Sequence, residues 1–401
     1  MRPPPEPPEW AEQLWSVGVT GTNGKTSTTG MVAALLGLLA RPVARTTTLG
    51  CFLDDEQLEV PGHYAGFLAT MQRCVEAGGR YAALELTSEA LAMGFAKAWP
   101  CRVGAFTNLS LDHSDAHGSA EQYLAAKAQL FMSLPAGASA VLNACDENAQ
   151  LLQEVLPEGV GVLRYGVASR GVAWAGLDLA ADAIVPSFDG TRAALLPSLR
   201  FPELPSQLEL RAIGDVFVEN ALAALGCALL AGVPVEPAVR LLATLPAPPG
   251  RFQVVRQSPH VVVDYAHTPD ALVRTLATAR QLCRGALTVV FGAGGDRDKA
   301  KRPLLGAAAC AADHIVLTSD NPRSEAPGVI MDEIAAGITA HGSVTREQDR
   351  ARAIQLALAR AGRDDVVLIA GKGHERTQQF AGQITAFSDV AIVEQWDKLA
   401  R

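Results

Sequence analysis

The chain of 401 residues lacks three features that would place it in a specialised class of protein. It has no signal-peptide pattern at its start and no apolar run of the roughly eighteen residues that cross a membrane. It has no basic run, only 19% charged residues and a net charge of −8, which argues against a nucleic-acid-binding surface. Its seven cysteines include no CxxC pair and no histidine at metal spacing, which favours a reduced protein over a disulfide framework. We therefore expect a soluble cytoplasmic protein that binds neither membranes nor nucleic acids.

Two domains are expected, because 49% of the residues are hydrophobic and a chain of this length can bury more than one core. In the first half, buried strand patterns alternate with helical patterns, which predicts a parallel sheet covered on both faces. The expected strands cover residues 81–86, 102–107 and 138–143, and the expected helices 27–39, 119–131 and 214–230. Short alternating runs broken by Pro and Gly over 166–211 predict a small antiparallel patch.

The proline-rich stretch 246–250 can be neither helix nor central strand, so we place the domain boundary there, with domains at 1–249 and 250–401. Beyond it, expected strands at 261–264, 287–291, 315–318 and 366–370 alternate with helical segments. The expected fold class is therefore α/β: a central P-loop domain with a mostly parallel, doubly wound sheet, followed by a C-terminal Rossmann-like domain.

The stretch 18–27, GVTGTNGKTS, follows an apolar run and precedes an amphipathic segment, as a phosphate-binding loop between a strand and a helix does. Gly21 and Gly24 would let backbone N–H groups turn around a phosphate chain. Lys25 would add a positive charge, and the Thr26 hydroxyl would hold Mg²⁺ at the helix N-terminus. The alternative is a glycine-rich tight turn, but Lys-Thr in the required place favours a nucleotide. The predicted contacts are Gly21, Thr22, Asn23, Gly24, Lys25, Thr26 and Ser27.

Glu85 and Asn108 each follow a buried strand, and the carboxyl ends of parallel strands carry ligands at one edge of a sheet. His113 lies soon after, in a segment rich in Asp and His. A lone histidine is more often structural, but one that shares this crevice with Glu85 and a nucleotide-bound Mg²⁺ is a candidate metal ligand. Lys127, taken alone, is typical of a solvated helix lysine.

Nine motifs now resemble one family in the family's own order. They are GVTGTNGKTSTT, LELTSEAL, FTNLSLDHSDAHG, YLAAK, GRFQVV, VVVDYAHTPDAL, FGAGGDRDKAKRP, DNPR and GKGHE, and they span residues 17–375. The chain resembles the Mur ligase family, most closely its MurE branch. The resemblance implies that ATP phosphorylates a substrate carboxylate and that an incoming amine displaces phosphate to form an amide. Transfer of phosphate between two anions needs their repulsion neutralised, which the two Mg²⁺ ions that the resemblance implies would do together with Lys25.

The resemblance also assigns roles to single residues. It implies that Lys25 contacts the β and γ phosphates, that Thr26 ligates a first Mg²⁺, and that Glu85 and His113 ligate a second. Lys127 resembles a carbamylated lysine that supports this second metal. From the adenine side and the second domain, the implied nucleotide contacts are Asn220, Arg251, Asp264 and His267, with Phe217 in place of a usual asparagine. Because these contacts come from both domains, domain closure should complete the site.

On the amine side, the chain is similar to MurE at the positions that hold diaminopimelate. These positions are Arg297, Asp320, Asn321, Arg323, Gly371 and Glu375. An arginine fork can grip an α-carboxylate, while a glutamate can hold a distal ammonium.

On the carboxylate side, the chain departs from the family. Only about ten to fifteen residues precede the P-loop strand, so the UDP-binding domain with which MurE proteins begin is expected to be missing. The Thr-Thr-Pro motif is replaced in 59–63, Ser-Ser-His is replaced by Thr87-Ser88-Glu89, and the arginine that should follow is absent from 91–95. Each change removes a contact to the UDP-linked substrate rather than to ATP.

Three interpretations follow. The first is a MurE-type ligase that joins a diaminopimelate-like amino acid to a carboxylate without UDP. The second is a peptidoglycan ligase whose UDP-binding domain is supplied by a partner chain. The third is a non-catalytic nucleotide-binding scaffold, which the presence of Glu85, His113 and Lys127 disfavours. A folylpolyglutamate-synthase-like activity would fit the layout, but DNPR and GKGHE favour MurE. We expect a monomer or weak dimer acting on small molecules.

Overall fold

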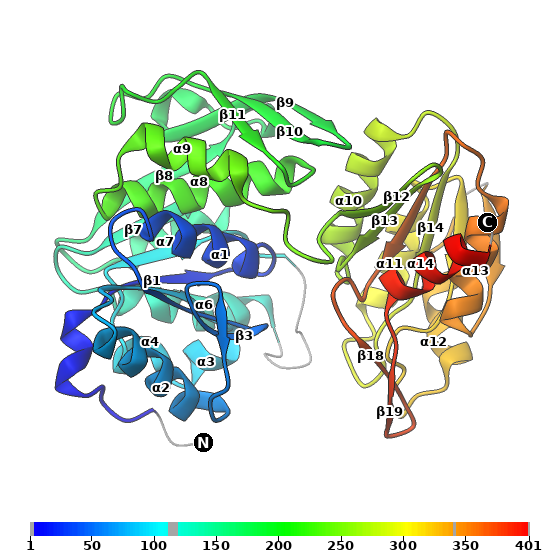
Figure 1. Cartoon of the computed structure of the whole chain (residues 1–401), viewed down its shortest axis with the longest axis horizontal. Coiled ribbons are helices and arrows are strands. Elements are labelled where there is room, and N and C mark those ends of the chain that lie inside the picture. Colours follow the sequence, from blue (N-terminus) through cyan, green and yellow to red (C-terminus); the bar gives the residue numbers. More distant parts are fainter. Residues whose placement is uncertain (1–3, 111–118, 340–341, 400–401) are drawn as a thin grey trace.

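The structure, a computed structural model of the chain, describes residues 4–110, 119–339 and 342–399. Two α/β units lie side by side, and the stretch around 245–252 connects them (Figure 1). Each unit has a mostly parallel sheet with helices packed on both faces, so the expected fold class is confirmed. Among the helices of the described ranges, none combines the length and the apolar character needed to cross a bilayer.

Among the described residues of the first unit, eleven strands form one sheet in the order β11-β10-β9-β8-β7-β6-β1-β5-β2-β3-β4. Its strands are β1 (Trp15–Thr20), β2 (Val43–Thr47), β3 (Gly50–Leu53), β4 (Glu56–Leu58), β5 (Tyr81–Glu85), β6 (Val103–Phe106), β7 (Ser139–Asn143), β8 (Gly161–Val167), β9 (Leu179–Ser187), β10 (Gly190–Leu195) and β11 (Gln207–Leu210). β1 runs parallel to both β5 and β6, and the chain order diverges on either side of it. The carboxyl end of β1 is therefore a topological switch point, where open α/β sheets bind ligands.

The region 166–211 contains the expected antiparallel strands, and they belong to the central sheet. β9, β10 and β11 do not form a separate patch: β9 pairs in parallel with β8, and the antiparallel pairs with β10 and β11 extend the central sheet. A hairpin of β3 and β4 extends the sheet in the same way at the opposite edge. Only the central strands, which are buried on both faces, carry the continuous apolar runs that the sequence reveals.

The helices of the first unit form two layers. They are η1 (Glu9–Gln13), α1 (Lys25–Leu36), α2 (His63–Glu76), α3 (Ser88–Ala92), α4 (Phe95–Ala98), α6 (Ala120–Met132), α7 (Asn148–Glu154), η2 (Ala168–Arg170), η3 (Trp174–Gly176), α8 (Asp215–Leu230) and α9 (Val235–Thr244). Val17 and Val19 of β1 face the core under α1 and α8, whereas Leu84 and Phe106 face the core under α2 and α6. This alternation follows from the two-residue period of a strand.

In the described part of the second unit, six strands form a sheet in the order β12-β13-β17-β14-β15-β16, in which only β12 is antiparallel to its neighbour. Its strands are β12 (Gln253–Gln257), β13 (His260–Asp264), β14 (Leu287–Phe291), β15 (His314–Leu317), β16 (Ser343–Arg346) and β17 (Val366–Ala370), with a separate hairpin of β18 (Thr377–Phe380) and β19 (Gln383–Ala386). Its helices are α10 (Pro269–Leu282), α11 (Lys301–Ala309), α12 (Pro327–Ala335), α13 (Arg350–Arg360) and α14 (Asp389–Leu399). The carboxyl ends of β13, β14, β15 and β17, with the loops that follow them, carry the expected site residues of this domain except Arg251, which lies just before β12.

Candidate active site

The phosphate loop lies at the carboxyl end of β1, and its shape is fixed from β6. Gly21 and Gly24 have φ angles of +150° and +85°. A Cβ at Gly24 would lie 2.3 Å from Asn220 Oδ1, so only glycine fits this close approach. Asn108 holds the loop in place: its Oδ1 accepts from Asn23 N at 2.9 Å and its backbone oxygen from Thr22 N at 2.8 Å. The loop is therefore formed in advance of any ligand.

Two of the expected metal-site residues are brought together beside this loop. Thr26 Oγ1 donates to Glu85 Oε2 at 2.9 Å, and the backbone N–H of Thr48 donates to the same oxygen at 3.1 Å. Lys25 Nζ donates to the carbonyl oxygens of Gly21 at 3.0 Å and Thr22 at 2.7 Å, so its charge lies over the loop. The Thr26 hydroxyl and Glu85 carboxylate are hard oxygen ligands next to a phosphate site, and this donor set suits Mg²⁺.

Lys127 differs from the solvated helix lysine that its position alone would predict. It is fully buried rather than solvated, because this face of α6 packs under the phosphate loop. Its Nζ donates to Gly21 O at 2.7 Å and lies 4.1 Å from the centre of the Tyr123 ring. Lys127 therefore reaches the same loop carbonyl as Lys25.

His113 lies outside the described residues, together with the rest of 111–118. Within the parts of the chain that the structure describes, no group of three His, Cys, Asp or Glu side chains forms a metal cluster. Of the four residues expected at the metal site, the structure therefore describes Thr26, Glu85 and Lys127.

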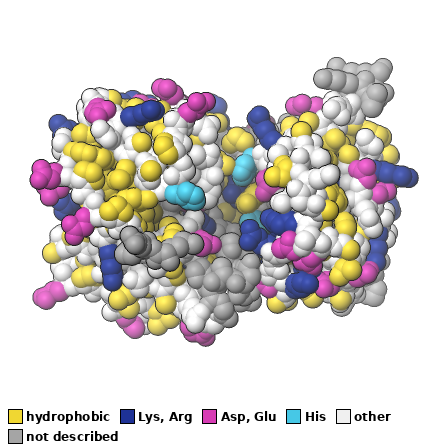
Figure 2. Space-filling model, turned by 90° about the horizontal axis from the view of Figure 1, so that it is seen from below, with side chains coloured by type: hydrophobic (Ala, Val, Ile, Leu, Met, Phe, Trp, Pro, Cys, Tyr) yellow, Lys and Arg dark blue, Asp and Glu magenta, His cyan; other side chains and the backbone are white. Residues whose placement is uncertain are grey.

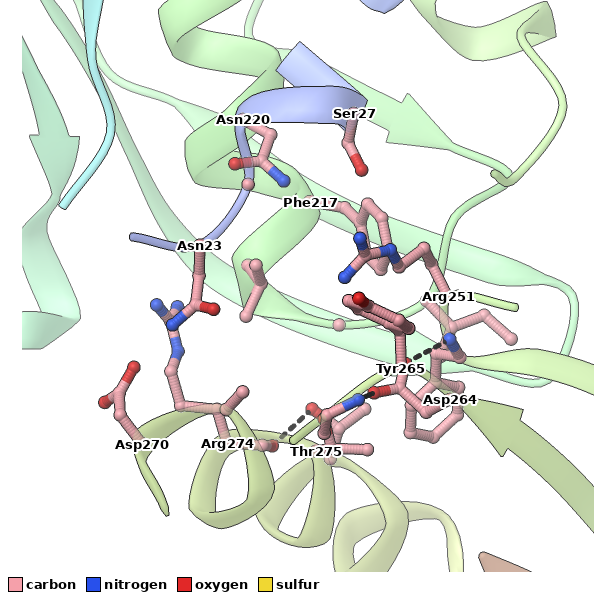
Figure 3. A pocket seen from close by; sticks show the side chains of 18 of the residues that line it. Asn23, Ser27, Phe217, Asn220, Arg251, Asp264, Tyr265, Asp270, Arg274 and Thr275 are labelled. Atoms are coloured by element: carbon pink, nitrogen blue, oxygen red, sulfur yellow. Dashed lines mark hydrogen bonds between the residues drawn. The ribbon is translucent and has the colours of Figure 1, made fainter. Parts of the chain in front are cut away.

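A pocket between the two domains extends from the phosphate loop (Figure 3). Asn23, Ser27 and Asn220 of the first domain face Arg251 and Tyr265 of the second. The expected nucleotide residues that line it are Asn23, Gly24, Ser27, Asn220, Arg251, Asp264 and His267, and Phe217 lines it as well. The remaining expected loop residues, Gly21, Thr22, Lys25 and Thr26, lie beside the pocket at the loop described above.

Asp264 shapes the wall of this pocket. Its carboxylate is buried and accepts from the backbone N–H groups of Phe252 at 2.5 Å and Ala266 at 2.7 Å, so it joins two loops of the second domain. Burial raises the pKa of Asp264, although Arg251 and these backbone donors oppose the change. Arg251 Cζ lies over the Tyr265 ring, 4.3 Å from its centre, and both residues line the pocket.

A second pocket, of about 240 Å³, lies at the carboxyl ends of the strands of the second domain. All six residues expected on the amine side line it: Arg297, Asp320, Asn321, Arg323, Gly371 and Glu375. Basic side chains gather on the edge of the second lobe that faces the first (Figure 2). The volume is below the range of pockets for drug-sized ligands, roughly 300–1,000 Å³, and suits one amino acid.

Side chains and backbone of the DNPR and GKGHE loops hold one another in this pocket. Asn321 Nδ2 and the Nζ of Lys372, a buried lysine, each donate to Glu375 Oε2 at 2.9 Å. Arg323 has a φ of +52°, and its Nη1 donates to Gly295 O at 2.6 Å. A Cβ at Gly371 would lie 2.6 Å from an oxygen of Asp320, so a larger residue would crowd the pocket.

The two pockets share a wall, since Tyr265 and His267 line both. The first domain contributes Glu89 to the amine pocket. The sequence did not predict Glu89 in this pocket, Lys372 beside Glu375 or Thr48 beside Glu85. The sequence does mark Glu89 as unusual, because it replaces a histidine of the family. Its position beside the amine pocket could not be predicted, because that position depends on how the two domains meet.

The comparisons with known proteins agree with this layout. The Mur ligase middle domain model matches residues 19–228, and the model described as Mur ligase, glutamate ligase domain, matches residues 250–373. The chain belongs to the Mur ligase family. Within that family it is an ATP-dependent acid–amino-acid ligase of the MurE type.

Its relatives include two proteins named UDP-N-acetylmuramoyl-L-alanyl-D-glutamate–2,6-diaminopimelate ligase. The one from Thermosynechococcus vestitus is 40% identical over 94% of this chain and 76% of its own length. The one from Vibrio vulnificus is 39% identical with the same coverage. A solved structure with this name has a TM-score of 0.67 and 34% identity, over 97% of this chain and 79% of that one. Folylpolyglutamate synthase from Mycobacterium tuberculosis, at 21% identity and a TM-score of 0.69 over 90% of this chain and 89% of its own, shares the fold.

Proposed function

We propose that the chain uses ATP and Mg²⁺ to activate a carboxylate as an acyl phosphate and joins it to the amine of a diaminopimelate-like amino acid. The observation that carries this proposal is the shared wall: Tyr265 and His267 separate the pocket at the phosphate loop from a pocket lined by both cations and anions. A phosphorylated carboxylate formed at the loop would therefore meet an amine held on the other side of that wall.

The first step would take place beside Glu85 and Thr26. An oxygen of the substrate carboxylate attacks the γ-phosphorus, the bond to the β-phosphate oxygen breaks, and ADP leaves. Lys25 would neutralise charge on the β and γ phosphates once it turns from the loop carbonyls to the ligand. Thr26, Glu85, His113 and Lys127, the last as a carbamate, are the residues we propose to hold Mg²⁺, which supplies further charge neutralisation. Asn220, Arg251, Asp264 and His267 would bind or orient the nucleotide.

The second step would draw on the second domain. The neutral amine nitrogen attacks the acyl carbon and the carbon–oxygen bond to phosphate breaks. The nitrogen loses one proton, and phosphate leaves as hydrogen phosphate as the amide forms. Arg323 and Arg297 would hold the α-carboxylate of the incoming amino acid. Glu375, fixed by Lys372 and Asn321, would accept a hydrogen bond from its distal ammonium, with Asp320 and Gly371 shaping the pocket.

The carboxylate substrate is the part of the proposal in which this chain differs from its relatives. Those relatives are named for a UDP-linked muramoyl dipeptide. At Thr87-Ser88-Glu89 and in 91–95, this chain lacks the histidine and arginine that the family would present to that substrate. Glu89 instead adds a negative charge next to the amine pocket. We therefore propose that the preferred carboxylate has no UDP group.

Phosphate release tests both parts of the proposal. Purified chain, ATP, Mg²⁺ and diaminopimelate would be incubated with L-alanyl-D-glutamate or with UDP-N-acetylmuramoyl-L-alanyl-D-glutamate, with lysine as the alternative amine. We expect turnover with the free dipeptide to equal or exceed that with the UDP-linked one. Lys25→Ala should abolish turnover with the fold intact. If no combination of carboxylate and amine gives turnover, the proposed ligase activity is wrong. A kcat/KM above roughly 10⁴ M⁻¹s⁻¹ for the UDP-linked dipeptide alone would overturn only the proposed carboxylate.

A second candidate is peptidoglycan-precursor synthesis with the UDP-binding part supplied by another chain. The observation in its favour is that 94% of this chain aligns with 76% of a relative named for that reaction. Its test is the same assay with a separately expressed UDP-binding domain of such a relative. A large gain in turnover of the UDP-linked dipeptide alone would favour this candidate. In both cases we propose a cytoplasmic enzyme whose domains divide at residues 249 and 250.

A further inference from the structure

Four charged side chains without a role so far meet where the second domain rests on the first. Arg274, on α10 of the second domain, donates from Nη2 to Glu219 Oε1 at 2.7 Å and to Asp215 Oδ2 at 2.9 Å, both on α8. Arg170, in η2, donates to the same Glu219 oxygen at 2.5 Å. Two positive and two negative groups thus balance at the domain contact.

The Arg274–Glu219 pair is nearly buried, whereas the side chains of Arg170 and Asp215 are each 36% exposed. The Arg274 side chain is 11% exposed and that of Glu219 is 4% exposed. Burial alone would lower the pKa of the Arg274 guanidinium, but the carboxylates of Glu219 and Asp215 raise it overall. A charge in such a place is far more costly without its partner than a surface charge. The pairing therefore favours the arrangement in which α10 rests on α8.

Hydrogen bonds lead from this group to the phosphate loop. Glu219 Oε2 accepts from Asn143 Nδ2 at 3.2 Å, and the same Nδ2 donates to Thr107 O at 2.7 Å. Thr107 Oγ1 in turn donates to Asn23 O at 2.7 Å, within the phosphate loop. All the side chains of this path, from Glu219 to Thr107, are buried. The Glu219 carboxylate, which pairs with the second domain, is therefore linked to the phosphate loop by three hydrogen bonds through Asn143 and Thr107.

We propose that Arg274 is a positioning residue of the ligase. By pairing with Glu219 and Asp215, it seats the second domain on α8, and through Glu219, Asn143 and Thr107 it keeps the phosphate loop in its binding shape. The inference rests on the proposed function, in that the pocket beside the loop is taken to be the nucleotide site. Arg274 and Asn23, at the two ends of the path, both line that pocket (Figure 3).

A second contact keeps the domains together when Arg274 is changed. The rings of Phe188, at the turn after β9, and His260, at the start of β13, are stacked with centres 3.5 Å apart and an angle of 10° between their planes. Loss of the Arg274 pairs should therefore loosen the nucleotide site without releasing the second domain. A purely structural ion pair would lower the stability of the protein and leave substrate constants unchanged.

The test compares Arg274→Gln with Arg280→Gln. Arg280 lies on the same helix and pairs with Asp313 within the second domain, where both side chains are more than a third exposed. We expect Arg274→Gln to raise the KM for ATP and the Kd for Mg-ADP at least tenfold, with the KM for the amino acid within twofold of wild type. Arg274→Lys should recover part of the loss, since it keeps the charge but not the two-way contact. Arg280→Gln should match the wild type.

Asp215→Asn keeps the test decisive if Arg274→Gln fails to fold. The Asp215 side chain is 36% exposed, and its change leaves the Glu219 pair in place. We expect Asp215→Asn to raise the KM for ATP and the Kd for Mg-ADP two- to fivefold. The double variant with Arg274→Lys should show no rise beyond that of Arg274→Lys alone. Wild-type binding of Mg-ADP with unchanged constants in folded Arg274→Gln or Asp215→Asn protein would overturn the inference. No binding of Mg-ADP by the wild type would overturn the nucleotide site itself.

Discussion

Lys127 brings a buried ammonium to the Gly21 carbonyl that Lys25 also contacts. Two cations beside a magnesium site would repel the metal, whereas a carbamate on Lys127 would attract it. We therefore expect Lys127→Ala to reduce the rate of phosphate release by on the order of 10²-fold, and millimolar formate or acetate to restore part of it. The measurement is turnover with and without the added carboxylate. Lys127→Arg fills the space but cannot form a carbamate, so its turnover should stay low with and without the added carboxylate. Full activity of Lys127→Ala without additives would contradict the role.

Arg323 is held in place by its bond to Gly295 O and by its backbone, which pairs with the strand β18. Removal of this guanidinium should raise the KM for the amino acid or lower kcat/KM by on the order of 10²-fold, about 2–4 kcal/mol for a buried charge pair. Steady-state kinetics of Arg323→Ala provide the measurement. Arg346→Ala is the matched control, because Arg346 forms an exposed pair with Asp332. A raised KM for ATP with an unchanged KM for the amino acid would show instead that Arg323 acts at the pocket beside the phosphate loop.

At the scale of residues, the sequence predicted the members of contiguous motifs best. The loops that carry Arg297, Arg323 and Glu375 each follow a buried strand of one sheet, and this topology brings them to one pocket. Lys372 was missed although it lies within GKGHE, because a lysine is rarely fully buried and its ion pair with Glu375 depends on local loop shape. Arg274 was missed because its partners belong to another domain.

At the scale of elements, Glu325 ties α11 to the loops of the amine pocket. Arg302, which is fully buried on α11, donates to both Glu325 oxygens at 2.8 and 2.9 Å, and Asp296 N donates to Oε1 at 2.6 Å. The hydrogen bonds from Arg302 lower the pKa of Glu325 to about 2. A carboxylate with a lowered folded-state pKa adds stability above its unfolded value, near 4.5, and this contribution is lost as the pH falls towards 2.

We therefore expect Glu325→Gln to be less stable than wild type by about 2 kcal/mol at pH 7, with part of the pKa shift discounted for screening. The difference should persist down to about pH 4.5 and shrink between there and pH 2. Denaturant unfolding of both proteins across this range provides the measurement. A difference that does not change with pH would show that the Arg302 pair is not its source.

Element boundaries followed from the sequence where a backbone signal was sharp. α1 begins at Lys25, two residues before the expected start, because Gly24 in a left-handed conformation ends the loop directly before it. The hairpin of β3 and β4 was not foreseen, since strands of three or four residues at a sheet edge have too little burial to show a clear alternation. Thr48, which contacts Glu85, lies in the turn that leads into this hairpin.

At the scale of the whole molecule, the pocket beside the phosphate loop has walls from both domains. A nucleotide that binds there should stabilise both domains together, since it contacts each of them in the folded state only. With Mg-ADP at about a hundred times its Kd, we expect a gain of about 2.7 kcal/mol and a rise in Tm of roughly 3 °C in a single transition. Calorimetry provides the measurement, with Lys25→Ala as the control that should show little rise. A shift confined to one of two separate transitions would contradict a site shared by both domains.

The two pockets differ in how they could be inherited. The nucleotide pocket draws on both domains, whereas the amine pocket, apart from Glu89, is lined by residues 265–375 of the second. A recombination event that exchanges the second domain would thus carry a new amine preference in one step, while Glu85 and Thr26 stay in their original surroundings. On the proposed function, the departures expected to alter the carboxylate contacts lie at 59–63 and 87–95 of the first domain, so such an exchange would leave the carboxylate site unchanged. Diversification of this enzyme would therefore be modular for the amine and gradual, residue by residue, for the acid.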